Sequence, residues 1–425
     1  MRLLKTPEEL FARENGLNLA IPDLELLFEA TLSPPEADQN ERAIRFHTEQ
    51  WHKRSSRRFH AYRRIEAIFG GNGLKQRFGS WRQIYETPQT VAAGSGAAVL
   101  AAASAFPGGD GLFVKKVEID ILKRFAWADG LSTFLSDAYR GGMVTNFLLS
   151  ALAIIVAVAY LPLASVDSKW PFALTEFILL VAILVIAHIG QRRRWHGRWF
   201  ETRRVAEYFR HAPIMLMLGV AHASGRWPRG ADTGWPEFYA RQVLSDIGLP
   251  SVKIEQHYLH HAWKDLLQQH SAHQRLYHEQ KARRLARVHH RLDKLSEWLF
   301  VMAVLSVATY LMLVGLAAGN LVPANLPHNI SKMFTFLGVI LPASGGTFAG
   351  IRYFGDFERF ASISETTAEK LSELQARITI LLNAPEGSLR YSQSAEMTHA
   401  LDDIVVSEIE NWQSVFDSKQ IAVPV

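Results

Sequence analysis

Eight histidines lie between residues 257 and 290, and imidazole is a side chain used for metal binding and for proton transfer near neutral pH. His257 and His261 are four residues apart, which places them on one face of a helix, as in a two-histidine metal site. A catalytic metal centre also needs a third ligand and a positioned base, and the HExxH order is missing. We therefore interpret this segment as the solvated face of a long helix, with a pH-responsive surface as the alternative, and expect no metal site.

Other patterns that could support catalysis are weak. Gly70–Gly73, followed by Lys75, matches neither the GxxxxGK[ST] nor the GxGxxG phosphate-binding pattern, and no strand is predicted before it. It is better explained as a turn that ends a helix. The absence of cysteine excludes disulfides and a thiolate nucleophile. We expect a protein that is not an enzyme and that needs no cofactor.

Ionisable residues inside apolar segments are more informative. Glu176 and His188 lie within one such segment, and charges within a membrane span are costly and usually functional. If several subunits surround an axis, Glu176 would form a carboxylate ring that favours cations. Alternatively, Glu176 reaches the membrane interface or pairs with Lys169.

Small residues in a later apolar segment form a second candidate for pore or gating function. Gly346 and Gly350 form a small-xxx-small pattern, which lets helix backbones approach closely. Pro342 and the Gly345–Gly346 pair would also allow a kink of the kind that gating helices use. Close packing within one subunit explains the glycines equally well.

These residues belong to apolar runs that are long enough to cross a membrane. About 20 residues of helix, at 1.5 Å per residue, span roughly 30 Å of hydrocarbon. The four runs contain no Lys, Arg or Asp and are Met143–Leu163, Pro171–Gly190, Trp298–Ala318 and Met333–Ile351. Because the connectors within each pair are short, we predict an all-α polytopic membrane protein with four transmembrane helices in two antiparallel hairpins, plus cytoplasmic helices.

Lys and Arg are distributed unequally around the four runs. The two connectors hold only Lys169 and Lys332, whereas nineteen basic residues lie near the opposite ends of the runs. Positive charge is enriched on the cytoplasmic side of membrane proteins, so we place both termini and the middle segment in the cytoplasm. The same clusters would bind anionic lipid. Aromatic residues that mark the edges of the runs are Trp170, Trp195, Trp298 and Tyr353.

These assignments divide the chain into five regions. They are a cytoplasmic region 1–142, a hairpin 143–190, a cytoplasmic region 191–297, a hairpin 298–351 and a cytoplasmic region 352–425. The Ala/Gly/Ser-rich stretch at residues 91–111 predicts a loop or a short packed helix, with a re-entrant segment as the alternative. Each hairpin precedes an amphipathic helix with an Ala–Glu pair, Ala206–Glu207 and Ala368–Glu369, which is compatible with duplication.

Four stretches, covering roughly residues 124–420, carry a resemblance to a known family. They are FAWADGLSTFLSDAYRGGMVTNFLLSALAII, RRRWHGRWFETRRVAEYFR, the segment from GWPEFYARQVLSDIGLPSVKIEQHYL to QRLYHEQKARRLARVHHRLDKLSEWLF, and GIRYFGDFERFASISETTAEKL with ENWQSVF. The chain resembles the SLATT-type bacterial membrane effectors in their two-hairpin form. The resemblance implies a non-enzymatic effector of anti-phage or nucleotide-signalling systems that permeabilises the inner membrane when triggered.

The start of the chain departs from that family. Relatives often carry a nucleotide-sensing or NAD-handling domain before the hairpins, whereas residues 1–142 lack the alternation of strands and helices that such a domain requires. Sensing would then fall to the cytoplasmic helices, to a separate nucleotide-sensing or nucleotide-synthesising protein, or to a missing segment.

Two functions of different class stay open. In the first, a homo-oligomer in the bacterial inner membrane forms a pore that a cytoplasmic ligand, such as a nucleotide-derived messenger, opens. Guanidinium groups suit phosphate, of a ligand or of lipid, and our candidates are Arg203, Arg204, Arg283, Arg284 and Arg287. In the second, the hairpins anchor a non-conducting scaffold that recruits a cytoplasmic partner. A membrane-bound hydrolase that uses the histidines is a distant third.

Overall fold

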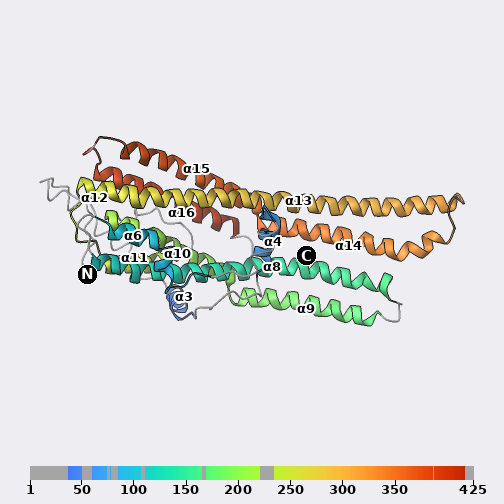
Figure 1. Cartoon of the computed structure of the whole chain (residues 1–425). Coiled ribbons are helices and arrows are strands. Elements are labelled where there is room, and N and C mark those ends of the chain that lie inside the picture. Colours follow the sequence, from blue (N-terminus) through green and yellow to red (C-terminus); the bar gives the residue numbers. More distant parts are fainter. Residues whose placement is uncertain are drawn as a thin grey trace.

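The fold is known from a computed structural model that describes residues 37–49, 60–73, 77, 85–106, 111–164, 169–220, 234–385 and 387–416. These residues form helices and no strand, so the all-α prediction is confirmed for them. Lys75, residues 165–168 of the first connector and parts of region 1–142 lie outside the described residues. Figure 1 shows an elongated molecule in which four long helices extend from a wider bundle.

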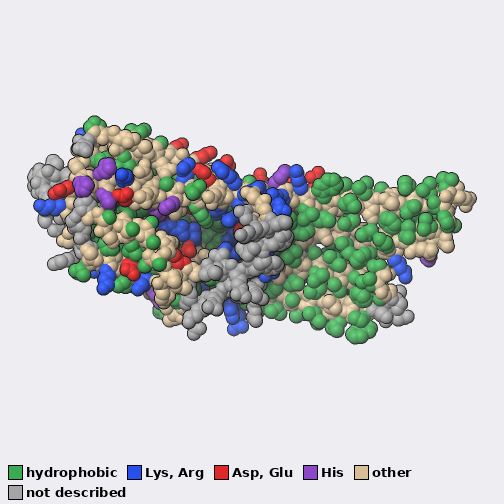
Figure 2. Space-filling model, viewed as in Figure 1, with side chains coloured by type: hydrophobic (Ala, Val, Ile, Leu, Met, Phe, Trp, Pro, Cys, Tyr) green, Lys and Arg blue, Asp and Glu red, His purple; other side chains and the backbone are tan. Residues whose placement is uncertain are grey.

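Four helices are long and apolar enough to cross a membrane, and each contains one of the predicted runs. They are α8 (Lys123–Leu163), α9 (Trp170–Arg192), α13 (Gln269–Ala318) and α14 (Leu326–Gly355). Hydrophobic side chains cover the end of the molecule that these helices form, while charged side chains gather on the rest (Figure 2). The protein is therefore membrane-embedded, and α8 and α13 extend well beyond their apolar runs into the charged half.

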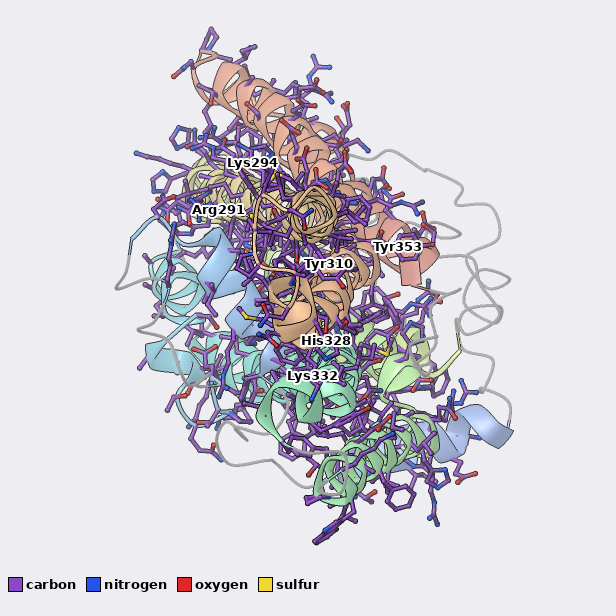
Figure 3. The ribbon with its side chains drawn as sticks, turned by 90° about the vertical axis from the view of Figure 1, so that its right-hand side faces the viewer. Arg291, Lys294, Tyr310, His328, Lys332 and Tyr353 are labelled. Atoms are coloured by element: carbon purple, nitrogen blue, oxygen red, sulfur yellow. The ribbon has the colours of Figure 1, made fainter. Side chains whose placement is uncertain are left out.

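The four membrane helices lie side by side in one row. α13 packs against α14, α14 against α8, and α8 against α9, and the end-on view gives the same order (Figures 1 and 3). A single row leaves both of its faces uncovered. More than half of the surface of apolar side chains such as Phe177, Leu184 and Leu311 is exposed. A soluble protein does not expose so much apolar surface, but lipid covers it at no cost.

The long helices belong to two units with the same order of elements. The first unit (Gly111–Leu218) comprises α7 (Gly111–Lys116), the π-helical segment η3 (Val117–Leu122), α8, α9 and α10 (Trp195–Leu218). The second unit (Gln256–Leu382) comprises α12 (Gln256–His261), the π-helical segment η5 (Ala262–Gln268), α13, α14 and α15 (Phe357–Leu382). In each unit the last helix folds back onto the long one, α10 onto α8 and α15 onto α13.

A left-handed residue forms the corner before the last helix of each unit. Arg194 has φ 48° and Asp356 has φ 43°, a conformation that non-glycine residues rarely adopt. Counting from these corners aligns the units, because the alanine of each Ala–Glu pair, Ala206 or Ala368, lies twelve residues further on. The sequence pattern that was compatible with duplication therefore coincides with a structural repeat.

The remaining helices pack around the two units, away from the membrane row. They are α3 (Ala37–Thr48), α4 (Ala61–Gly70), η2 (Val91–Ala93), α6 (Ala97–Ser104), α11 (Trp235–Ile247) and α16 (Tyr391–Phe416). α6 contacts α7 and η5 and buries Ala102 and Ala103, so the stretch at 91–111 contains a short packed helix. α4 ends at Gly70, and Arg291 donates to the carbonyls of Phe69 and Gly71, both at 2.9 Å. The predicted helix-ending turn is thus confirmed.

One of the four predicted interfacial aromatic residues is misplaced. Trp170, Trp298 and Tyr353 are exposed at the ends of their apolar runs, as predicted. Trp195 is only 4% exposed, because the corner at Arg194 turns α10 back toward α8 and buries the indole against Gly142. The prediction for Trp195 is wrong because it assigned this residue to the exposed edge of the second run and did not anticipate the corner at Arg194.

Candidate functional site

A cavity of about 180 Å³ lies among α4, α8, α10, α13, α15 and α16, in the charged half of the molecule. Figure 2 shows a hollow with Lys and Arg side chains in this half. The five cationic side chains that line the cavity are Arg63, Arg140, Arg203, Lys281 and Arg284. The three carboxylates that line it are Glu66, Glu207 and Glu408. The cavity contacts both long helices, and each of these helices continues into the membrane row.

Only two of the five arginines that we proposed from the sequence for anion binding line the cavity. Arg203 on α10 and Arg284 on α13 line it, whereas Arg204, Arg283 and Arg287 do not. Successive helical residues point about 100° apart, so Arg204 is buried on another side of α10 and Arg283 is exposed on the outer side of α13. The Nε group of Arg287 donates to the carbonyl of Arg283 at 3.0 Å.

Aromatic rings hold two of the cations in place. The guanidinium of Arg140 lies 4.2 Å from the ring centroid of Tyr62 and 5.1 Å from that of Trp199. The ammonium of Lys281 lies 4.3 Å from the ring of Trp412. Such cation–π contacts fix both the position and the direction of the charge. The wall of the cavity is therefore aromatic as well as cationic.

Glu207 is the centre of a buried charge network beside the cavity. It pairs with Arg203, lies 3.5 Å from Arg210 and is 3.8 Å from His211. Asp129 pairs with the same two arginines, at 3.3 Å and 3.1 Å. Burial alone would raise the pKa of Glu207, but the two arginines outweigh it and hold this pKa well below its ordinary value. Glu207 is therefore a permanent anion that orients Arg203.

A second buried group joins α13 to α16. Glu408 lies 3.5 Å from both Lys281 and His278. Burial alone would raise the pKa of Glu408, but Lys281 and His278 together keep it below the ordinary value. Burial lowers the pKa of His278 to about 4 despite the neighbouring carboxylate. His278 is thus neutral at pH 7, and the ion pair is between Lys281 and Glu408.

The lowered pKa of His278 predicts acid sensitivity. Between pH 6.5 and about 4 the unfolded chain binds a proton at His278 and the folded chain does not, so stability falls as the pH falls through this window. The full loss is at most about 3 kcal/mol. The lowered pKa of Glu408 extends the loss in the same direction at lower pH. Thermal unfolding in detergent at pH 7.5 and 5 measures it.

We expect His278→Gln to flatten this pH dependence. The matched control is His273→Gln, because His273 is exposed on the same helix. It should retain the acid sensitivity of the parent protein. Equal pH profiles for the two variants would contradict the assignment.

The structure places the two ionisable residues of the second span away from the cavity. Glu176 lies on α9, partly exposed, and within the described residues it has no ion pair, with Lys169 or any other group. The ammonium of Lys169 instead lies 5.2 Å from the ring of Tyr160. His188 is exposed near the other end of α9. Neither residue has a function within a single chain that the structure identifies.

The glycines of α14 have three different environments. A Cβ at Gly345 would lie 3.5 Å from the Cβ of Leu299 on α13, and a Cβ at Gly350 would lie 2.6 Å from the ring of Phe147 on α8. A Cβ at Gly346 would meet nothing within 4 Å. Gly346 and Gly350 therefore form no shared packing face within one chain. α14 continues through Pro342 and these glycines as one helix.

The histidines of residues 257–290 differ in exposure, although we interpreted the segment as a solvated face. Four of the eight histidines are exposed, namely His257, His260, His273 and His290. His278 is buried, and the Nε2 atom of His270 lies 3.1 Å from the Nδ1 atom of His211. His261 lies 2.9 Å from Asp265. In the part of the chain that the structure describes, no three His, Cys, Asp or Glu side chains are grouped to hold a metal.

Residues 135–222 match the model of DUF4231, a family described as a protein of unknown function. The matched segment contains the end of α8, all of α9 and all of α10, so it corresponds to most of the first unit. No curated protein and no solved structure matches the chain.

Sequence reasoning missed several cavity residues for identifiable reasons. Arg140 was counted only as a charge near the membrane, and Glu207 only as half of a repeated dipeptide. Tyr62 lies on α4, which reaches the cavity by packing against both α8 and α13. The spacing of Ser132, Ser136 and Arg140 on one face of α8 was a signal in the sequence, because three polar residues at four-residue intervals precede an apolar run.

Proposed function

We propose that the chain is an effector of the bacterial inner membrane. In this proposal α8–α9 and α13–α14 form two antiparallel hairpins whose connectors face outward, and both termini are cytoplasmic. Copies of the chain assemble into a pore that opens when a small anionic ligand or a partner protein acts on the cavity. The charge asymmetry around the spans supports this orientation, and the SLATT resemblance suggests a role in anti-phage defence.

The observation that carries the proposal is that the helices at the two edges of the membrane row, α9 and α13, each leave a face uncovered. α14 packs onto α8 through Gly350, Ile351 and Phe354, and the last two of these residues are buried. The residues of α9 at the same distances before the corner are His188, Ile189 and Arg192, and all three are exposed. α9 at one edge thus has an uncovered face at the position in the repeat where α14 contacts α8, with different side chains.

The opposite edge of the row is α13, which corresponds to α8 in the repeat. If α13 of one copy packs against α9 of the next, it repeats between chains the contact that α8 and α14 make within one chain. Such head-to-tail contacts close into rings when the rotation allows. The row would then become the wall of a pore, and one Glu176 from each copy would lie at the same level of that wall.

Disulfide cross-linking tests this arrangement, and the chain has no native cysteine to interfere. We expect a ladder of dimers and larger species when His188→Cys is combined with Val301→Cys or Trp298→Cys, both of which alter exposed positions on α13. Each single variant should remain monomeric on a denaturing gel, because a head-to-tail contact does not bring two copies of one residue together. A dimer of the His188→Cys variant alone would contradict the arrangement.

Conduction is tested in cells and in liposomes. We expect expression to depolarise the inner membrane, and the purified protein to release dye from loaded liposomes once it is activated. Glu176→Gln preserves the shape of the side chain and removes its charge, so the preference for cations over anions should fall several-fold. A cross-linked ring that neither depolarises cells nor releases dye would favour the alternative, a non-conducting scaffold that recruits a cytoplasmic partner.

A further inference from the structure

We infer that the cavity binds a phosphate group between Arg140 on α8 and Arg284 on α13. Only the suggestion that phosphate binding opens a pore rests on the proposed function. Binding itself can be measured without conduction. A phosphate at this position would link the first unit to the second, because Arg140 and Arg284 belong to different units.

The first argument is the distribution of charge pairs around the cavity. Arg63 pairs with Asp137 at 2.5 Å, Arg203 pairs with Glu207, and Lys281 pairs with Glu408. Arg140 and Arg284 form no ion pair with any carboxylate among the described residues. Two cations that have no carboxylate partner of their own, on the wall of one cavity, lower the free energy of an anion bound there.

The second argument is that Arg140 is held in position and that the stem of Arg284 packs beside the cavity. Arg140 donates from Nε and Nη2 to the hydroxyl of Ser136, at 3.0 Å and 2.6 Å, which leaves other N–H groups of its five available. The stem of Arg284 rests on the end of α4, where a Cβ at Gly70 would lie 2.8 Å from its Cγ. An anion therefore meets at least one guanidinium group, that of Arg140, which has already lost much of its freedom.

The third argument is an unsatisfied hydroxyl in the wall of the cavity. Tyr62 is 1% exposed, and within the described residues its hydroxyl has no partner in hydrogen-bond geometry. Burial raises the pKa of Tyr62, so this group stays protonated and can donate. A buried donor without an acceptor is destabilising, and a phosphate oxygen would satisfy it. Ser132, Thr133 and Ser136 supply further hydroxyls along the α8 wall.

The size and depth of the cavity limit the ligand. At about 180 Å³ it is smaller than the usual pocket for a whole drug-sized molecule, so it accommodates a phosphate and a small part of its carrier. Arg140 lies three residues, or roughly 4–5 Å, before the first apolar run, which is the depth of lipid headgroups. The phosphate is therefore carried either by a soluble phosphorylated compound or by an anionic phospholipid.

Binding to the full-length protein in nanodiscs tests the inference and separates the two sources. In phosphatidylcholine nanodiscs, pyrophosphate and inorganic phosphate are titrated while thermal stability and heat of binding are measured. In the second arm, phosphatidylglycerol replaces part of the phosphatidylcholine, and bound lipid is identified by native mass spectrometry. Stabilisation in the first arm assigns a soluble ligand, and stabilisation only in the second assigns a lipid headgroup.

The variants are chosen to separate the site from general charge effects. Arg284→Ala should weaken binding about tenfold or more, because it removes a charge-assisted contact. Arg283→Ala removes the same charge from the neighbouring position, which does not line the cavity, and should leave binding unchanged. Tyr62→Phe removes only the hydroxyl and should weaken binding several-fold, whereas Glu66→Gln removes an opposing charge in the cavity and should strengthen it.

Two outcomes would overturn the inference. One is the absence of stabilisation in both arms. The other is an equal loss of affinity in Arg284→Ala and Arg283→Ala, which would indicate binding to the general basic surface. Neither outcome affects the cross-linking or dye-release experiments. Phosphate binding can therefore be disproved while the proposed pore stands, and the pore can be disproved while phosphate binding stands.

Discussion

Glu207→Ala is expected to lower the free energy of unfolding by about 1–3 kcal/mol, because it removes a buried carboxylate and leaves the half-buried Arg203 and Arg210 with one shared carboxylate instead of two. Asp129 remains beside both arginines, and since its side chain is one-third exposed it compensates only partly. The melting temperature of the detergent-solubilised protein should fall by several degrees.

The matched control for this variant is Glu279→Ala. Glu279 also pairs with two arginines, Arg275 and Arg283, but it does so on the exposed side of α13. Pairs at the surface contribute less than about 1 kcal/mol, so this variant should unfold close to the parent protein. Similar losses in the two variants would mean that the Glu207 network is not buried in the folded protein.

Gly350→Leu is expected to separate the two units within the membrane. A Cβ at this position already lies 2.6 Å from the ring of Phe147, so a leucine must displace either that ring or α14 itself. Overpacking of this kind costs about 1–3 kcal/mol, and the proposed pore should also lose its activity because the wall is interrupted. Thermal unfolding and dye release measure the two effects.

Gly346→Leu provides the comparison on the same helix. A Cβ at Gly346 meets nothing within 4 Å, so stability in detergent should stay unchanged or rise slightly with the better helix propensity. Phe147→Ala combined with Gly350→Leu should recover part of the loss, since it vacates the space that leucine requires. Failure of this rescue, with equal losses at Gly346 and Gly350, would show that the close approach of α14 to α8 is not what the glycine maintains.

The sequence was sufficient to predict the helices, because the signals are local. Four apolar runs of about 20 residues specify spans, and a change from apolar to amphipathic periodicity specifies the helices that follow them. The lengths of α8 and α13 were harder to anticipate, since polar segments continue these helices without a break. The π-helical segments and the left-handed corner at Asp356 have no sequence signature in this chain.

The candidate site was predicted only in part, because it depends on contacts between distant segments. Arg203 and Arg284 were selected as arginines suited to phosphate, and this reasoning applied equally to Arg283 and Arg204, which face elsewhere. Only the packing of the helices determines that Arg203 lines the cavity and Arg204 does not, and that Arg284 lines it and Arg283 does not. Tyr62 precedes Arg284 by more than 200 residues, so no pattern in the sequence could join them.

The corners at Arg194 and Asp356 have a mechanical consequence. α15 begins at the residue directly after Asp356, so no flexible loop separates it from α14. Two helices joined in this way move as a bent lever. With 26 residues, α15 is roughly 39 Å long, and a one-degree tilt of a rigid α14 moves its far end by roughly 0.7 Å. Phe360, the α15 residue that lines the cavity, lies only four residues after Asp356, so a tilt of α14 would be transmitted to the cavity wall through this single corner residue.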